Sequence, residues 1–138
     1  MRRQSWFVAV GLLVAGCSSG SATSEGTPSQ VVVTIVTGIG TPQVFTGFPT
    51  TLPHSGSTLQ VSAIDSVGAP IRLDPARYRF DVTPAVLNGF YVVTQTTNTV
   101  LGVTVQQAAP SVPMTWKLTD LVRNRIVVGP TVTNVVLQ

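Results

Sequence analysis

Side chains that could carry catalysis or bind a metal are few in this 138-residue chain. It holds one cysteine, Cys17, one histidine, His54, and five acidic residues. Active sites and metal centres normally bring several such groups together, whereas His54 stands alone among the loop-forming residues of 52–56. We expect His54 to be a solvated loop residue. This inventory predicts that the chain is not an enzyme and that it binds neither a metal nor a cofactor.

Four of the acidic residues are aspartates in the C-terminal two thirds of the chain, and their spacing does not fit a calcium loop. They are Asp65, Asp74, Asp81 and Asp120, and no two of them stand at the Asp-x-Asp spacing of such a loop. Arginines occur in the same region, namely Arg72, Arg77, Arg123 and Arg125. We expect surface ion pairs between the two sets, and such pairs contribute little to stability.

Cys17 follows a segment that has the order of an export signal. Arg2 and Arg3 precede an uncharged apolar run at 6–16, which ends in small residues. The run is much shorter than the about 20 residues that a membrane-spanning helix needs, so we expect it to be removed. A single cysteine cannot form an intrachain disulfide, and a free thiol is a liability in an oxidising compartment.

The four residues Val14-Ala15-Gly16-Cys17 resemble the lipobox of bacterial lipoprotein precursors. This resemblance implies cleavage before Cys17, a diacylglyceryl group on its sulfur and attachment to a membrane. Two or more acyl chains anchor a protein stably, whereas one binds reversibly. Ser18 stands where an aspartate would favour retention in the inner membrane of enterobacteria. We therefore expect the outer membrane if the host has one, and otherwise the outer face of the plasma membrane.

Composition divides the chain into a signal peptide at 1–16, the lipidated cysteine with a disordered tether at 17–30, and one domain at 31–138. The tether has no large apolar residue and cannot bury enough surface to offset its chain entropy. The domain is long enough for a core without disulfides. Two of the arginines behind the net charge of +3 lie in the signal peptide, so the charge gives no reason to expect a nucleic-acid partner.

Apolar and polar residues alternate in the domain, which is the pattern of strands with one buried face. The residues expected to point inward are Leu59, Val61 and Ala63, then Ala76, Tyr78, Phe80 and Val82, then Leu101, Val103 and Val105, and finally Met114, Trp116 and Leu118. We expect Trp116 to be the large aromatic residue of the core.

Eight strands are expected, and Gly, Pro and Asn mark turns between them, one of them at Gly129-Pro130. The strands cover 31–37, 58–65, 76–82, 90–96, 99–106, 112–120, 125–128 and 131–137. Short strands with turns about every 8 to 12 residues indicate an all-β protein with an antiparallel sandwich of seven or eight strands.

The stretch from Gly56 onward resembles bacterial immunoglobulin-like domains of the invasin and intimin type. The resemblance lies in the Gly-Ser-Thr-Leu-Gln-Val-Ser-Ala strand at 56–63, the Asp-x-x-Gly-x-Pro-Ile turn at 65–71, the Phe-x-Val strand at 80–82 and the late strand that closes on Asp at 115–120. It implies an immunoglobulin-like β-sandwich, but its motifs are turn and packing signals without chemistry.

The segment 37–57 is too long for a hairpin and carries Phe45 and Phe48. Long loops in compact domains are often functional, and exposed aromatic residues mark contact surfaces. Two interpretations stay open: the two rings cap the open edge of the core, or they contact a partner. The connectivity of an immunoglobulin-like sandwich predicts that this loop lies at the end of the domain away from the tether, with both rings facing outward.

These observations favour a lipid-anchored, non-catalytic cell-envelope module that acts as a spacer, adhesion or assembly element. The alternative is a small carbohydrate- or peptide-binding lipoprotein that uses the segment 37–57. In both cases the expected partners are a membrane, reached through the lipid on Cys17, and a protein or glycan that the sequence does not identify.

Overall fold

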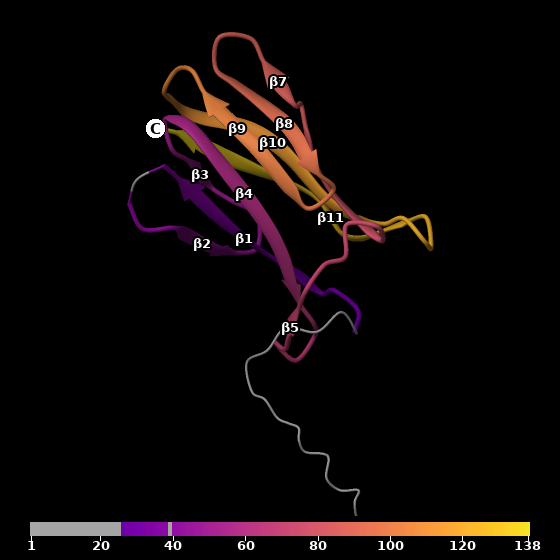
Figure 1. Cartoon of the computed structure of the whole chain (residues 1–138). Coiled ribbons are helices and arrows are strands. Elements are labelled where there is room, and N and C mark those ends of the chain that lie inside the picture. The colour runs from indigo at the N-terminus through magenta and orange to yellow at the C-terminus, as the bar shows by residue number, and fades with distance from the viewer. Residues whose placement is uncertain (1–25, 39) are drawn as a thin grey trace, which may run out of the picture.

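The computed structural model describes residues 26–38 and 40–138, and all regular secondary structure in this part of the chain is β-strand. Eleven strands form two sheets that face each other (Figure 1). The expected signal peptide at 1–16, Cys17 and the expected tether as far as residue 25 lie outside the described residues. The all-β fold class is therefore confirmed for the domain.

The larger sheet has seven strands in the order β2-β1-β4-β9-β8-β7, with β5 paired to β4. Their bounds are Gln30–Thr37 for β1, Gln43–Thr46 for β2, Ser55–Ile64 for β4, Pro70–Ile71 for β5, Val86–Leu87 for β7, Tyr91–Thr97 for β8 and Val100–Val105 for β9. All pairs in this sheet are antiparallel.

The smaller sheet has four strands in the order β3-β11-β10-β6. Their bounds are Thr51–Leu52 for β3, Tyr78–Thr83 for β6, Ala109–Asp120 for β10 and Arg125–Leu137 for β11. The pairs β10–β11 and β10–β6 are antiparallel, whereas β3 runs parallel to β11.

The long strands follow the order of an immunoglobulin fold. One sheet contains β1-β4-β9-β8 and the other contains β11-β10-β6, which matches the ABED and GFC sheets of such domains. The predicted immunoglobulin-like sandwich is confirmed, and it gains four short strands, β2, β3, β5 and β7, of two to four residues each.

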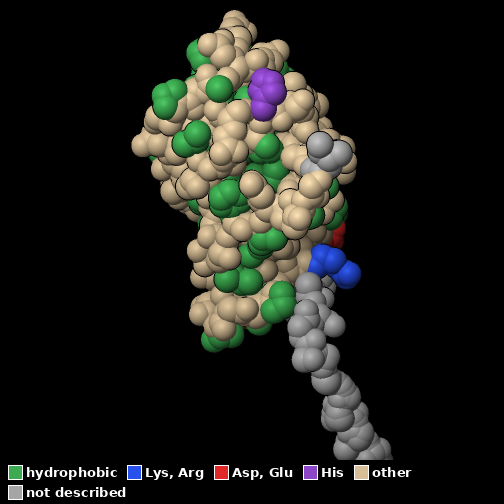
Figure 2. All heavy atoms as spheres, turned by 90° about the vertical axis from the view of Figure 1, so that its left-hand side faces the viewer, with side chains coloured by type: hydrophobic (Ala, Val, Ile, Leu, Met, Phe, Trp, Pro, Cys, Tyr) green, Lys and Arg blue, Asp and Glu red, His purple; other side chains and the backbone are tan. Residues whose placement is uncertain are grey.

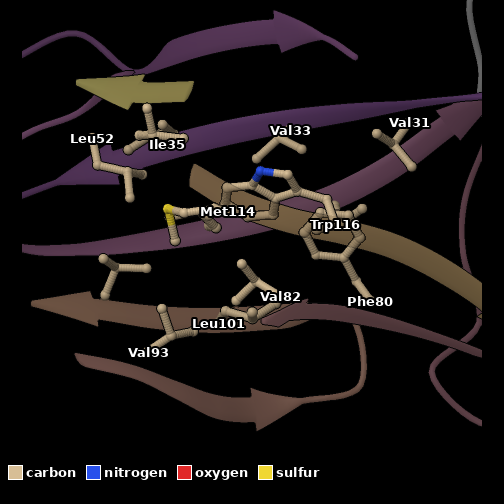
Figure 3. Packing of buried hydrophobic residues seen from close by; sticks show 14 of the residues in the cluster. Val31, Val33, Ile35, Leu52, Phe80, Val82, Val93, Leu101, Met114 and Trp116 are labelled. Carbon is tan, nitrogen blue, oxygen red and sulfur yellow. The ribbon is translucent and has the colours of Figure 1, made fainter. Parts of the chain in front are cut away.

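The core is formed by the inward residues of both sheets, and Trp116 lies fully buried at its centre (Figure 3). The ring centroids of Phe80 and Trp116 are 5.7 Å apart. The Trp116 Nε1–H donates to Thr133 Oγ1 at 2.8 Å, and this hydroxyl donates to the carbonyl oxygen of Pro49 at 3.2 Å. The indole is thus buried, and its N–H has a hydrogen-bond acceptor, as a buried tryptophan requires. The prediction that Trp116 belongs to the core is confirmed.

The expected turn at Gly129-Pro130 is wrong, because both residues lie inside the single strand β11. Pairing with β10 passes from Trp116 opposite Thr131 to Leu118 opposite Val128, so two residues of β11 face one of β10. This is a β-bulge, which uses the same residue types as a turn. Gly129 has a φ of 87°, and a Cβ there would lie 2.6 Å from the Trp116 carbonyl oxygen.

Two further expectations about boundaries are corrected. The segment 37–57 is not one loop, because it contains β2 and β3 and leads directly into β4. The strand expected from Ala76 begins at Tyr78, because Asp74 closes a turn just before it. The Asp74 carbonyl oxygen accepts the N–H of Tyr78 at 2.8 Å, and its Oδ1 accepts the N–H of Ala76 at 2.9 Å. Ala76 is consequently exposed rather than inward.

Candidate functional site

The two phenylalanines of the segment 37–57 lie alongside the core and not at the tip of the domain. Strand β2 runs antiparallel to β1 and places Phe45 opposite Val33. The N–H of Gly47 then donates to the Val31 carbonyl oxygen at 2.7 Å, close to where β1 begins. The chain has thus turned back from the far end before it reaches Phe48. The prediction that both rings face outward at the far end is wrong.

Phe48 lies in the segment that crosses from β2 in one sheet to β3 in the other. Its ring centroid lies 6.1 Å from that of Phe80 and 6.4 Å from that of Trp116, with interplanar angles of 21° and 16°. Phe45 and Phe48 are both half-buried and pack against the core. Of the two interpretations, these contacts favour the one in which the rings close the open edge of the sandwich.

His54 lies where the segment 37–57 does reach the far end. It is exposed and lines a hollow of about 570 Å³ together with Thr37, Gly38, Pro53, Ser55 and Gly56. Next to this hollow in the chain, the Ser57 hydroxyl is buried and has no hydrogen-bond partner among the described residues.

Among the described residues, no group of three or more His, Cys, Asp or Glu side chains is arranged to hold a metal. His54 is the only titratable residue that lines the hollow at the far end.

Asp120 is the one charged residue that the described part of the chain buries. Its Oδ2 accepts a hydrogen bond from Arg77 Nη2 at 3.2 Å, and Arg123 Nε lies 3.9 Å away. Its Oδ1 accepts the backbone N–H groups of Val122 and Arg123, each at 3.0 Å. Burial alone would raise the pKa of Asp120, but the N–H of Arg123, the Arg77 guanidinium and the N–H of Val122 outweigh it and hold this pKa below its ordinary value.

The other aspartates act locally. Asp65 Oδ1 accepts the N–H groups of Val67 and Ala69 at 3.0 and 2.9 Å, so it closes its own turn, as Asp74 does. Asp81 pairs with Arg79 at 2.9 Å on the solvent side of β6. The expected surface ion pairs therefore form only in part, and neither Arg72 nor Arg125 pairs with a carboxylate within 26–38 and 40–138.

The buried position of Asp120 is not among the expectations from the sequence, although the sequence contains a signal for it. Asp120 stands in phase with Met114, Trp116 and Leu118 on β10, and every second residue of this strand points inward. An in-phase aspartate directly before a turn could have been recognised as a buried cap for that turn.

Charge is distributed unevenly over the domain. The seven-stranded sheet contains no Asp, Glu, Lys, Arg or His in any of its strands, and its outer face carries mainly Thr, Val, Gln and Ser. On the outer face of the four-stranded sheet, a hollow of about 330 Å³ is lined by Arg79, Asp81 and Lys117 among others. The remaining charged residues of the described chain lie in or beside the turns.

The described residues contain no helix long and apolar enough to cross a membrane. No protein-family model, curated protein or solved structure matches the chain.

Proposed function

We propose that the chain is a bacterial lipoprotein, and that its sandwich serves as a non-catalytic cell-envelope module, a spacer, adhesion or assembly element. The observation that carries this proposal is the position of the only cysteine, Cys17, directly after a basic, apolar and small-residue sequence. In a host with two membranes the outer membrane is the proposed location, and otherwise the outer face of the plasma membrane.

The architecture supports a module that is held at one end. The first strand, β1, begins with Gln30 opposite Ile64, and the preceding Ser29 N–H donates to the Ile64 carbonyl oxygen at 2.8 Å. The chain therefore enters the sandwich at a fixed point, and the hollow beside His54 lies at the opposite end of β1 and β4. We also propose that the domain belongs with the immunoglobulin-like domains of invasins and intimins, on the strength of the motifs at 56–71.

Anchoring is tested with Cys17→Ser and the matched control Ser18→Ala in cells that receive radioactive palmitate. We expect the control to be processed, labelled and retained by membranes after a carbonate wash. The Cys17→Ser chain is expected to stay unprocessed and unlabelled, because it lacks the sulfur that accepts the diacylglyceryl group. Normal processing together with palmitate labelling of Cys17→Ser would overturn the proposal, and neither readout depends on how strongly an uncleaved signal peptide binds membranes.

A second candidate is a carbohydrate- or peptide-binding lipoprotein, and the hollow at the far end favours it. The lining of the hollow is mainly apolar and includes the polar residues His54, Thr37 and Ser55, a mixture that suits a small neutral ligand. Glycan and peptide arrays probed with the mature protein, with His54→Ala and with Phe45→Ala test this candidate. Signals that are lost only with His54→Ala would support binding in the hollow, whereas signals unaffected by both substitutions would exclude the segment 37–57.

A further inference from the structure

Two turns of the sandwich end in valines that are almost fully exposed. Val67 in the β4–β5 turn is 85% exposed, and Val122 in the β10–β11 turn is 74% exposed. They are the most exposed large hydrophobic residues among those described, and Leu121 beside Val122 is exposed as well. Transfer of such a side chain from water into an apolar layer is favourable.

The β4–β5 turn lies near the start of the described chain, and the β10–β11 turn projects to the right from the same half of the sandwich (Figure 1). Strand β4 reaches its turn at Ile64, opposite Gln30 at the start of β1. Strand β10 reaches its turn at Asp120, and the next N–H, that of Leu121, donates to the Arg77 carbonyl oxygen just before β6 begins. Both turns therefore belong to the half of the sandwich into which the chain from Cys17 enters.

Arginines outnumber carboxylates at this end, with Arg72, Arg77, Arg123 and Arg125 against Asp65, Asp74 and Asp120. Arg72, Arg123 and Arg125 lie beside the two turns and are exposed. Of the carboxylates at this end, Asp74 is exposed and Asp65 is half-buried, and both accept N–H groups of their own turns. The buried carboxylate of Asp120 is held by Arg77 and the N–H groups of its turn. On the face shown in Figure 2, Lys and Arg side chains are visible only beside the start of the described chain, next to an acidic side chain.

Chain length restricts how far this end can move from a lipid on Cys17. Even a fully extended chain advances at most about 3.3 to 3.6 Å per residue, so Gly26 cannot lie more than about 30 Å from Cys17. If Cys17 carries the proposed lipid, this short reach keeps the end close to the bilayer.

We infer that this end of the sandwich docks onto an anionic bilayer, and this inference rests on the proposed lipidation of Cys17. The side chains of Val67, Leu121 and Val122 enter the interfacial layer, as apolar residues of membrane-surface proteins do. The guanidinium groups of Arg72, Arg123 and Arg125 bind lipid phosphates, for which their planar donor geometry is suited. Docking orients the domain, so that the His54 hollow at the other end points away from the membrane.

The test uses the lipidated mature chain on vesicles of phosphatidylglycerol and phosphatidylcholine that contain brominated acyl chains. Because lipidation consumes Cys17, a cysteine introduced by Val67→Cys or Val122→Cys is the only free thiol and can carry a fluorescent probe. Val86→Cys is the matched control, because Val86 is 50% exposed on β7 and lies toward the far end of the sheet. We expect bromine quenching at 67 and 122 and none at 86.

Charge variants test the arginines. Each arginine removed from the docking end should lower the ratio of docked to undocked protein about fivefold, the effect of about one charge near an anionic surface. The double variant Arg123→Gln with Arg125→Gln should therefore lose most of the quenching at residue 67. Lys117→Gln, which removes the same charge from the outer face of the four-stranded sheet, should leave it nearly unchanged. Salt at about 1 M should act as the double variant does.

The outcomes separate docking from anchoring. If the chain stays on the vesicles after a high-salt wash but its probes at 67 and 122 remain unquenched, docking is refuted while the proposed lipidation stands. If the chain washes off, the lipid anchor itself has failed. Equal quenching at 67, 122 and 86, or equal quenching on purely phosphatidylcholine vesicles, would also refute a docking end built on these arginines.

Discussion

The Asp120 carboxylate at the end of β10 holds the Arg77 guanidinium, with 3.2 Å between Oδ2 and Nη2 and only 1% of the aspartate side chain exposed. Arg77 precedes β6, so the contact ties the entry of one strand to the exit of its neighbour. The same carboxylate accepts two N–H groups of the turn that follows, those of Val122 and Arg123. One side chain therefore fixes both the β10–β11 turn and its position against β6.

Asp120→Asn should destabilise the domain at neutral pH, because it leaves Arg77 without its charged partner and weakens the turn. The native pKa of Asp120 lies below its ordinary value, so its carboxylate contributes stability above the unfolded pKa of about 3.9. This contribution is lost as the pH falls through the lower native pKa. Urea unfolding of both proteins should show a stability difference at pH 7 that shrinks below about pH 4. A difference that stays constant down to pH 2.5 would contradict this role.

Asp81→Asn provides the matched control. Asp81 also pairs with an arginine, Arg79, but on the exposed face of β6. Exposed pairs contribute at most about 1 kcal/mol, so this substitution should change stability little at any pH.

Trp116→Ala should lower the free energy of unfolding by about 3 to 5 kcal/mol, the usual cost of emptying a buried aromatic site. Trp116→Phe keeps a ring against Phe80 but removes the donor to Thr133, and it should cost less. Denaturant unfolding followed by circular dichroism measures both. A loss below about 1 kcal/mol for Trp116→Ala would be incompatible with the position of the indole at the centre of the core.

Alternation within single strands was enough to predict most of the core. It predicts the inward positions of Phe80, Leu101 and Trp116, all of which are buried, because a period of two residues is a property of one strand and needs no knowledge of its neighbours. The same property put Tyr78 and Val82 on the buried face of β6.

Features that depend on distant partners could not be predicted in the same way. Strand β3 has two residues and exists only because Val136 and Leu137 run beside it. Phe48 is half-buried because Phe80 and Trp116 come from strands far along the chain. The dipeptide Gly129-Pro130 suits both a turn and a bulge, and only pairing with β10 decides between them. The positions of the candidate site residues were the hardest to predict, since these residues lie in such segments.

Gly129→Ala should destabilise the domain by about 1 to 3 kcal/mol, the cost of a strained backbone position. The new Cβ would meet the Trp116 carbonyl oxygen at 2.6 Å and would occupy a φ of 87°, which side chains disfavour. Gly56→Ala is the control, because Gly56 on β4 has open space around it and no positive φ. Thermal or urea unfolding compares the two, and equal stability of both variants would show that the bulge adapts freely.

Phe48→Ala should lower stability by about 2 kcal/mol, less than a fully buried ring but well above a surface change. The reason is its stacking against Phe80 and Trp116, which the smaller side chain cannot replace. Val44→Ala, in the same segment but 63% exposed, should stay within about 0.5 kcal/mol of the parent protein. If Phe48→Ala were as neutral as Val44→Ala in urea unfolding, the ring would not support the core, and the interpretation of Phe48 as a partner contact would regain its force.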